Sequence, residues 1–348
     1  MTPAAARPAT IWYTRCPVPS ATGIAIQRGW LADEFAPDGI AVHSLRHSPD
    51  RDVRETHFTH RLQNMFRQGG NAPPLYAKSA GEDIALLGMY WVPQYQGILT
   101  LPATGIRSLA ELRGRRLALP TRSQEKIDFF RSMALQSFTH ALRLAGLRED
   151  EVEFVDVPAD VGYVDEAPTS ADGMSVMVPR LVRQQTPEVL ALVRGEVDAI
   201  FGHSVWGVEL RELLGARELI NLARQPDRSL QINNGQPKVL TVSGPLLREH
   251  PDLVARYLAQ LERAARWARE NRDEALRAIA IETGSAEYWL PEGIGPETFA
   301  HLDMSFDPHL IDALEVRKNF LLERGFIKHD FDLRAWADPD VLRRALAS

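Results

Sequence analysis

Residues 97–119 read GILTLPATGIRSLAELRGRRLAL, and this stretch combines two short apolar runs with a helix signal between them. The runs at 97–101 and 116–119 have the length and composition of buried strands. Ser108 and Glu111 have the spacing of a capping box, and a glycine follows three residues later, so we expect a short helix between the two strands. The stretch therefore predicts a strand–helix–strand unit of an α/β protein.

Helices and short apolar runs alternate along the rest of the chain. Thr186, followed by Pro187 and Glu188, predicts the start of a helix that ends at Gly195. Another helix is expected after Pro251, where apolar residues recur on one helical face. Further buried strands are expected at residues 84–87, 151–157, 199–201 and 239–242. This alternation indicates an α/β fold with largely parallel sheets.

Length and composition limit the classes of protein to consider. At 348 residues the chain is longer than one hydrophobic core usually supports, so we expect two lobes with a ligand cleft between them. The net charge is −6, the pI is near 6.0, and arginines are interspersed with acids, which does not predict a nucleic-acid surface. No run approaches the roughly 18 apolar residues of a membrane span, and residues 1–9 lack the features of a secretory signal. We therefore expect a cytoplasmic monomer with neither nucleic acid nor membrane as a partner.

Cys16 is the only cysteine, so an internal disulfide and a zinc site of several thiolates are both excluded. It lies in YTRCPVPS at residues 13–20, where two prolines exclude a continuing helix and favour an extended turn after a first strand. In open α/β sheets the segment after a strand's carboxyl end faces the ligand crevice. A lone cysteine is commonly a buried core residue, but this placement makes Cys16 a candidate nucleophile or acid. Arg15 would point to the opposite side of the extended segment.

A second group of candidate residues follows, with HFTH at 57–60 and RQGG at 67–70. His57 can orient or deprotonate a thiol, and Arg67 offers a planar fork of donors to an oxyanion. Glycines such as Gly70 let backbone N–H groups approach a ligand closely. Together these residues could hold an anion beside a sulfur. Each also has a structural interpretation, because a histidine before an aromatic residue is commonly a core residue and Gly-Gly commonly forms a turn.

Three histidines, His43, His47 and His60, lie close enough in sequence to suggest a metal site. The arginines around them, including Arg46 and Arg54, would repel a cation. No carboxylate–histidine pair has the spacing of metal ligands. We therefore expect neither a metal nor a cofactor.

The order of these elements resembles the two-lobed type II periplasmic-binding-protein fold, in which the chain leaves the first lobe, builds the second and returns. Residues 97–116 match the crossover with the opening helix and strand of the second lobe, and residues 195–200 match a strand that leads back toward the cleft. The resemblance implies a lobe I of residues 1–99 and 226–348, which carries the candidate thiol, and a lobe II of residues 100–225. Such a fold says little about function.

Three motifs in the first 75 residues carry a more specific resemblance: Tyr13 with CPVP at 16–19, HFT at 57–59, and Arg67 with GG at 69–70 and PPL at 73–75. They resemble the 2'-hydroxybiphenyl-2-sulfinate desulfinase family, which acts last in dibenzothiophene biodesulfurization. Weaker similarity continues to the C-terminal region, so the resemblance covers nearly the whole chain.

The resemblance implies roles for four residues. Cys16 would be the catalytic cysteine and His57 would support it. Arg67 and the backbone N–H of Gly70 would bind the sulfinate oxygens. A sulfinate spreads one negative charge over two oxygens, and an arginine can meet both of them with charge-assisted hydrogen bonds.

The activity implied is that of a hydrolase that releases sulfite from an aryl sulfinate, by one of two mechanisms. The Cys16 thiolate can attack the sulfur and form a thiosulfonate-type intermediate that water resolves, with His57 as the base. Alternatively, the Cys16 thiol protonates the ring carbon and sulfite leaves after water is added, with His57 orienting the thiol. The sequence leaves both mechanisms open.

Three positions depart from the family pattern. His60 and Leu62 stand where a tyrosine and a glutamine are expected, and His203 stands where an aromatic residue is expected. With Phe58, these residues are expected to line the part of the pocket that holds the substrate ring. The departures leave the reaction type better supported than a biphenyl substrate, so the expected partner is a small aromatic anion.

Other functions fit some of these features. A substrate-binding protein for a small aromatic or sulfonate-like anion is the strongest rival, because the fold mostly serves transport. The missing export signal and a cysteine beside an anion-binding cluster argue against it. A decarboxylase on the same fold would take a carboxylate in place of the sulfinate. A thiamine-pyrimidine synthase is disfavoured, because that relative uses a cysteine-rich motif and this chain has one cysteine.

Overall fold

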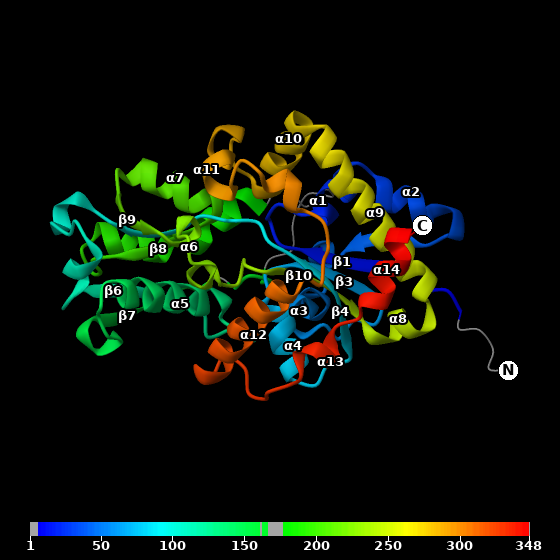
Figure 1. Cartoon of the computed structure of the whole chain (residues 1–348), viewed down its shortest axis with the longest axis horizontal. Helices are drawn as coiled ribbons and strands as arrows, with labels where there is room; N and C mark the ends of the chain where they lie inside the picture. The colour runs from blue at the N-terminus through cyan, green and yellow to red at the C-terminus, as the bar shows by residue number, and fades with distance from the viewer. Residues whose placement is uncertain (1–5, 161, 166–176, 348) are drawn as a thin grey trace.

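The computed structural model describes residues 6–160, 162–165 and 177–347, which form two lobes along the long axis of the molecule (Figure 1). The first lobe is built on a five-stranded sheet with the strand order β2-β1-β3-β10-β4. Its strands are β1 (Thr10–Arg15), β2 (Ala41–Ser44), β3 (Met65–Gly69), β4 (Ile84–Tyr90) and β10 (Lys238–Ser243).

The second lobe holds a three-stranded sheet with the order β8-β5-β9 and a separate pair, β6-β7. Its strands are β5 (Gln96–Thr100), β6 (Arg116–Thr121), β7 (Glu153–Pro158), β8 (Ile200–His203) and β9 (Arg217–Asn221). All six apolar runs that the sequence predicted as strands are therefore strands. The predicted two-lobed α/β architecture is confirmed.

Helices pack around both lobes (Figure 1). Those of the first lobe are α1 (Ala21–Gln27), α2 (Trp30–Phe35), α3 (Arg51–Thr59), α4 (Ala72–Ser79), α8 (Gly244–Glu249), α9 (Pro251–Glu270), α10 (Arg272–Thr283), α13 (Leu333–Trp336) and α14 (Pro339–Ala347). The second lobe has α5 (Phe129–Leu144), α6 (Met177–Val193) and α7 (Ser204–Leu214), while α11 (Leu290–Ile294) and α12 (Pro308–Glu323) lie near the junction. Among the helices in the described parts of the chain, none combines the length and the apolar character needed to cross a membrane.

The expectation of largely parallel sheets is wrong. β1 is parallel to β2 and β3, and β6 is parallel to β7. However, β10 is antiparallel to both β3 and β4, and β5 is antiparallel to both β8 and β9. The path of the chain explains the mixed sheet: β10 enters it from the cleft, where β1 and β3 end, and must therefore run in the opposite direction.

Two predicted helices also differ from the structure. The segment after Ser108 is a 3-10 helix, η4 (Leu109–Leu112), and Ser108 makes no side-chain cap. The predicted start at Thr186 is wrong, because α6 already runs from residue 177 and Pro187 lies inside it. The tripeptide has the local signature of a first turn, and a proline is unfavourable in a helix interior. The packing of α6 residues such as Leu192 in the second-lobe core outweighs this local preference. By contrast, α9 begins at Pro251 as predicted.

A buried arginine connects the two lobes. Arg317 of α12 is fully buried and donates from Nη2 to the Ser132 hydroxyl of α5 at 2.7 Å. Its Nη1 donates to Gln136 of the same helix, and its Nε donates to Asn71 Oδ1, at the start of α4, at 3.4 Å. Burial lowers the pKa of Arg317 to about 9. One side chain therefore bonds to both lobes beside the cleft.

The lobe boundaries expected from the sequence, at residues 99–100 and 225–226, stay predictions. β5 pairs only with strands of the second lobe, which favours a first crossing slightly before residue 100. The chain returns to the first sheet with β10.

Candidate active site

Cys16, Arg67 and Gly70 lie together where β1 and β3 end. The two strands are parallel neighbours, and their register places Thr14 beside Arg67. The Cys16 backbone N–H donates to the Gln68 carbonyl at 3.1 Å, which continues the pairing past the end of β1. Arg67 is almost fully buried; its Nη1 donates to the Gly70 carbonyl at 2.7 Å, and its Nη2 lies 3.7 Å from Cys16 Sγ. Adjacent parallel strands thus bring the thiol and the guanidinium into contact.

Two glycines allow this close approach. Gly69 has a φ of +153°, and a Cβ at this residue would lie 2.4 Å from Cys16 Sγ. A Cβ at Gly70 would lie 2.5 Å from Nδ2 of Asn234. Both distances are far shorter than a non-bonded contact allows, so a side chain at either position would displace the thiol or the amide. The Gly-Gly pair therefore brings these groups close to the backbone, beyond forming a turn.

His57 contacts the strand that leads to the thiol. Its Nδ1 lies 2.9 Å from the hydroxyl of Thr14, two residues before Cys16. No hydrogen bond joins His57 to Cys16 in the described part of the chain. Burial, helped by the charge of Arg67, lowers the pKa of His57 well below its usual value, so the imidazole is neutral near neutral pH. In this arrangement His57 can orient the end of β1 through Thr14.

Arg15 points away from the thiol, as predicted for an extended segment. It forms a buried ion pair with Glu282 of α10. Neither Arg15 nor Arg67 is among the described residues that line the pocket beside Cys16, but Arg67 Nη2 reaches the sulfur from behind this lining. Arg67, and not Arg15, is therefore the arginine that meets the sulfur.

Both lobes line a pocket beside Cys16. The first lobe and the crossing segments contribute Cys16, Pro17, Val18, Gly70, Gln94, Asn234, Gly235 and Lys238, and the second lobe contributes Phe129, Phe130, Met133, Tyr163, His203, Ser204 and Trp206. No carboxylate is among these lining residues. A wider surface hollow elsewhere shares none of them and contains no cysteine. An aromatic wall with a lysine in the lining, and with Arg67 behind the thiol, suits an aromatic anion.

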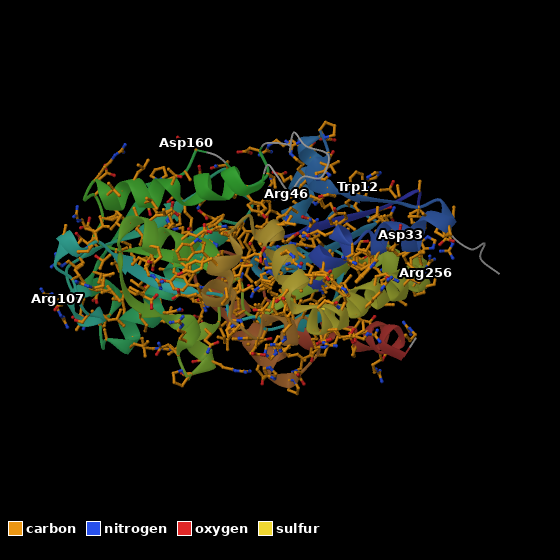
Figure 2. All side chains as sticks on the ribbon, turned by 90° about the horizontal axis from the view of Figure 1, so that it is seen from above. Trp12, Asp33, Arg46, Arg107, Asp160 and Arg256 are labelled. Carbon is orange, nitrogen blue, oxygen red and sulfur yellow. The ribbon has the colours of Figure 1, made fainter. Side chains whose placement is uncertain are left out.

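Tyr163 closes one side of the pocket and is held from the opposite lobe. Its ring lies 4.9 Å from the His57 ring and 5.5 Å from the Phe129 ring, measured between centroids. Arg46 donates to the Tyr163 carbonyl at 3.2 Å, and its guanidinium lies 4.3 Å from the tyrosine ring centroid. Arg54 of α3 donates to the neighbouring Val164 carbonyl at 2.9 Å. Figure 2 shows Arg46 near the junction of the lobes, where it can fix this segment across the cleft.

His203 is the one predicted ring-contacting residue that lines the pocket. It directly precedes α7, and its ring packs against Phe201 and Trp206 at centroid distances of 5.9 and 5.6 Å. Its Nδ1 lies 2.6 Å from Nε2 of Gln185. Burial lowers the pKa of His203 to about 4, so the imidazole is neutral near neutral pH. His203 therefore adds a neutral hydrogen-bonding ring to an otherwise apolar wall.

The other three predicted contacts lie behind the lining. Phe58 is fully buried and packs against Tyr163 at 6.2 Å, which supports the wall from outside. His60 ends α3 with a φ of 55°, and its Nδ1 lies 3.2 Å from the Phe58 carbonyl. Leu62 follows in the segment before β3. Their roles in substrate binding stay predictions.

Several pocket residues were missed by the sequence analysis, above all Lys238. It is fully buried at the start of β10, and its Nζ donates to Gln94 Oε1 at 2.7 Å and to the Gly235 carbonyl at 2.8 Å. Burial lowers the pKa of Lys238 to about 7, and the nearby Cys16 sulfur opposes that shift. The available signal was a lysine directly before a run predicted to be a buried strand. The aromatic wall had a weaker signal in the Phe129-Phe130 pair.

Known proteins are similar to this chain in sequence and in structure. No model of a known protein family matches the chain. The 2'-hydroxybiphenyl-2-sulfinate desulfinase of Rhodococcus erythropolis is 28% identical over 365 aligned positions, which cover 97% of this chain and 93% of the relative. The same enzyme from Rhodococcus qingshengii matches equally well.

Solved structures give the same result. The crystal structure of the desulfurization enzyme DszB has a TM-score of 0.77 and 26% identity, covering 97% of this chain and 99% of that one. A cysteine-to-serine variant of DszB in complex with biphenyl-2-sulfinic acid has a TM-score of 0.76 at 26% identity, with the same coverage. The periplasmic aliphatic sulphonate binding protein SsuA from Escherichia coli, 14% identical over 95% of this chain and 92% of its own, has a TM-score of 0.66 and shares the fold. The predicted periplasmic-binding-protein-like fold is confirmed, and the chain is similar over nearly its whole length, in sequence and in structure, to 2'-hydroxybiphenyl-2-sulfinate desulfinase.

Proposed function

We propose that this chain is an aryl sulfinate desulfinase, an enzyme that acts on a carbon–sulfur bond. It takes up an aryl sulfinate and water and releases the arene and hydrogen sulfite. The C–S bond breaks, the ring carbon gains a proton, and the sulfur gains the hydroxyl group of water. By this balance the enzyme is a hydrolase, and it needs neither a cofactor nor a redox partner.

The observation that carries the proposal is the contact of the Arg67 guanidinium with the only thiol, which lines an aromatic pocket whose described lining residues include no carboxylate. Arg67 has one Nη on the Gly70 carbonyl and the other on the Cys16 side, so its planar fork is held rigidly. A sulfinate placed there meets the cation and the sulfur together, while its ring lies against Phe129 and Trp206. The similarity to DszB bound to biphenyl-2-sulfinic acid supports this orientation.

Cys16 can act in two ways from this position. As a thiolate it attacks the sulfinate sulfur, and the arene leaves once its ring carbon is protonated; water then breaks the new S–S bond, which releases hydrogen sulfite and regenerates the thiol. As a thiol it protonates the ring carbon directly, and water then adds to the sulfur and regenerates the thiol. The His57 contact with Thr14, and not with the thiol, favours an orienting role over direct deprotonation in the unliganded arrangement. His203 also affects which substrates bind, since a neutral imidazole in the wall can form a hydrogen bond with a polar ring substituent.

A sulfite-release assay tests the proposal. Purified chain is given benzenesulfinate, naphthalenesulfinate and biphenyl-2-sulfinate, and sulfite is measured with the arene as the matched product. We expect equal amounts of sulfite and arene, with no effect of chelators. The Cys16→Ser variant should retain its fold and its affinity for the sulfinate while losing nearly all turnover, because serine keeps the shape but lacks an easily ionised thiol.

Other outcomes identify the alternatives. Carbon dioxide release from the matching aryl carboxylates, without sulfite from the sulfinates, would indicate a decarboxylase. Tight binding of sulfinates or sulfonates without any product would indicate a binding protein. A Cys16→Ser variant that keeps more than about a tenth of the wild-type rate would remove the cysteine from the chemistry.

A further inference from the structure

Lys238 is a buried ammonium group without a carboxylate partner. It is fully buried and lines the same pocket as Cys16. Among the residues that the structure describes, it forms no ion pair with an aspartate or a glutamate, and its hydrogen bonds go to a neutral amide and a neutral carbonyl. Isolating a cation from water costs free energy unless an opposite charge accompanies it. Lys238 therefore has no counter-ion among the described side chains, and an anion in the pocket could serve as one.

The hydrogen bonds of the ammonium group leave room for one more acceptor. An ammonium group has three N–H donors. Two of them are used, by Gln94 Oε1 at 2.7 Å and by the Gly235 carbonyl at 2.8 Å. Gln94 is itself fixed, because its Nε2 donates to the Ser204 hydroxyl at 3.1 Å. The side chain is therefore held in one position, with a third donor available to a molecule in the pocket.

We propose that Lys238 is a second cation of the substrate site, which binds the sulfinate group of the substrate together with Arg67. This inference rests on the proposed function and adds a residue to it. Two fixed cations then accompany one sulfinate in a pocket whose described lining holds no carboxylate, and both remain close when the sulfur leaves as sulfite. Arg67 meets the oxygens with its fork, and Lys238 adds one charged donor from the crossing segment between the lobes. Lys238 contacts Gln94 and Gly235, which lie in the two segments that cross between the lobes. An anion bound to Lys238 therefore lies beside these crossing segments.

The pH dependence of binding separates this role from a purely structural one. In the unliganded chain the pKa of Lys238 is about 7, so the amine is largely neutral at pH 8. A bound anion favours the charged form, and binding at pH 8 should therefore take up nearly one proton. A sulfinate is fully ionised throughout this range, so it cannot be the source of the effect.

Other titratable groups surround Lys238. Burial raises the pKa of Tyr90, which faces Lys238 from β4, well above its usual value. Burial lowers the pKa values of His57 and His203, so both are neutral at pH 7 to 9. Arg67 stays charged, and Tyr163 lines the opposite wall. The Cys16 thiol is removed from the titration by using the Cys16→Ser chain, which also prevents turnover.

The test is calorimetric titration of benzenesulfinate into the Cys16→Ser chain in two buffers with different ionisation enthalpies. Removing the Cys16 sulfur lowers the pKa of Lys238 further in this chain, so we expect uptake of about one proton at pH 8 and an affinity that falls about 50- to 100-fold between pH 7 and pH 9. Adding Lys238→Met should weaken binding at pH 6.5 by about 10- to 100-fold and abolish both the proton uptake and the pH dependence. Lys238→Arg should restore part of the affinity without the pH dependence, because a guanidinium does not titrate in this range.

Lys328→Met is the matched control, since Lys328 is an exposed lysine outside the pocket, and it should change none of these values. Thermal unfolding reports whether Lys238→Met folds, and we expect a midpoint no lower than that of the parent because methionine removes a buried charge. Unchanged affinity and proton uptake in a folded Lys238→Met chain would overturn the role of Lys238 while the desulfinase proposal stands. Failure of the parent chain to bind any aryl sulfinate would overturn both.

Discussion

Replacing Gly69 by alanine should damage catalysis more than folding. A Cβ at this residue would lie 2.4 Å from Cys16 Sγ, so the sulfur must move by about 1 Å to reach an ordinary contact distance. A displacement of about 1 Å at the reacting group costs on the order of 100-fold in rate. The movement also disturbs the 3.7 Å contact of the sulfur with Arg67 Nη2. We therefore expect kcat for sulfite release to fall about 100-fold, with a smaller change in the affinity for the sulfinate.

The stability cost of Gly69→Ala should be about 2 to 4 kcal/mol, from overpacking and from an alanine at positive φ. Gly81→Ala is the matched control, because Gly81 has a φ of +87° and no atom within 4 Å of the position of its Cβ. That variant should lose about 1 kcal/mol of stability and no activity. Sulfite release and urea unfolding of both variants separate the two effects. A folded Gly69→Ala chain with more than half of the wild-type kcat would show that the position of the Cys16 sulfur does not limit the reaction.

Three further predictions concern charge, pH and specificity. Arg67→Lys should reduce kcat/KM for sulfite release nearly as much as Arg67→Ala, because an ammonium lacks the planar fork that bonds to the Gly70 carbonyl and meets two anion oxygens in a fixed geometry; a lysine variant with normal kcat/KM would contradict the anion-binding role. Burial lowers the pKa of His140 to about 4, so its contribution to stability is complete above pH 6.5 and is lost as the pH falls toward 4. His140→Gln should therefore reduce the loss of unfolding free energy between pH 6.5 and pH 5 by about 2 kcal/mol, and equal urea-unfolding curves for the two chains at both pH values would refute this. His203→Phe should shift the ratio of kcat/KM values for biphenyl-2-sulfinate and benzenesulfinate toward the biphenyl compound by about tenfold or more, and an unchanged ratio would exclude His203 from the specificity of the pocket.

Six strands of this fold could be predicted from sequence as short apolar runs, and β1 was expected before Cys16. The strands β2, β3 and β9 were not predicted, because polar residues interrupt their sequences AVHS, MFRQG and RELIN. The direction of pairing could not be predicted as well, since it depends on the path of the chain between the lobes. The start of α6 was misplaced because Thr186 and Pro187 carry a local signal that packing overrides. Local signals fix the existence of an element more reliably than its limits or its partners.

The same distinction holds for the candidate site. Cys16, Arg67 and Gly70 meet because two neighbouring strands, β1 and β3, end side by side. The sequence predicted a strand before Cys16 but none ending at Gly69, and only the family resemblance placed the three residues in one site. Lys238 and Tyr163 arrive from segments far along the chain, and no spacing in the sequence shows that they line the same pocket. His57 was predicted to act on the thiol, whereas the structure shows its contact with Thr14.

The position of β10 has a consequence for biosynthesis. This strand lies between β3 and β4 in the first sheet, but its residues are made after every strand of the second lobe. A nascent chain must therefore reach Ser243 before β3 and β4 lose their open edges. The second-lobe strands, from Gln96 to Asn221, are continuous in the chain and can assemble earlier. The lobe whose residues begin the chain is thus the last to be completed, and a nascent chain that stalls before β10 would expose two unpaired strand edges beside the thiol.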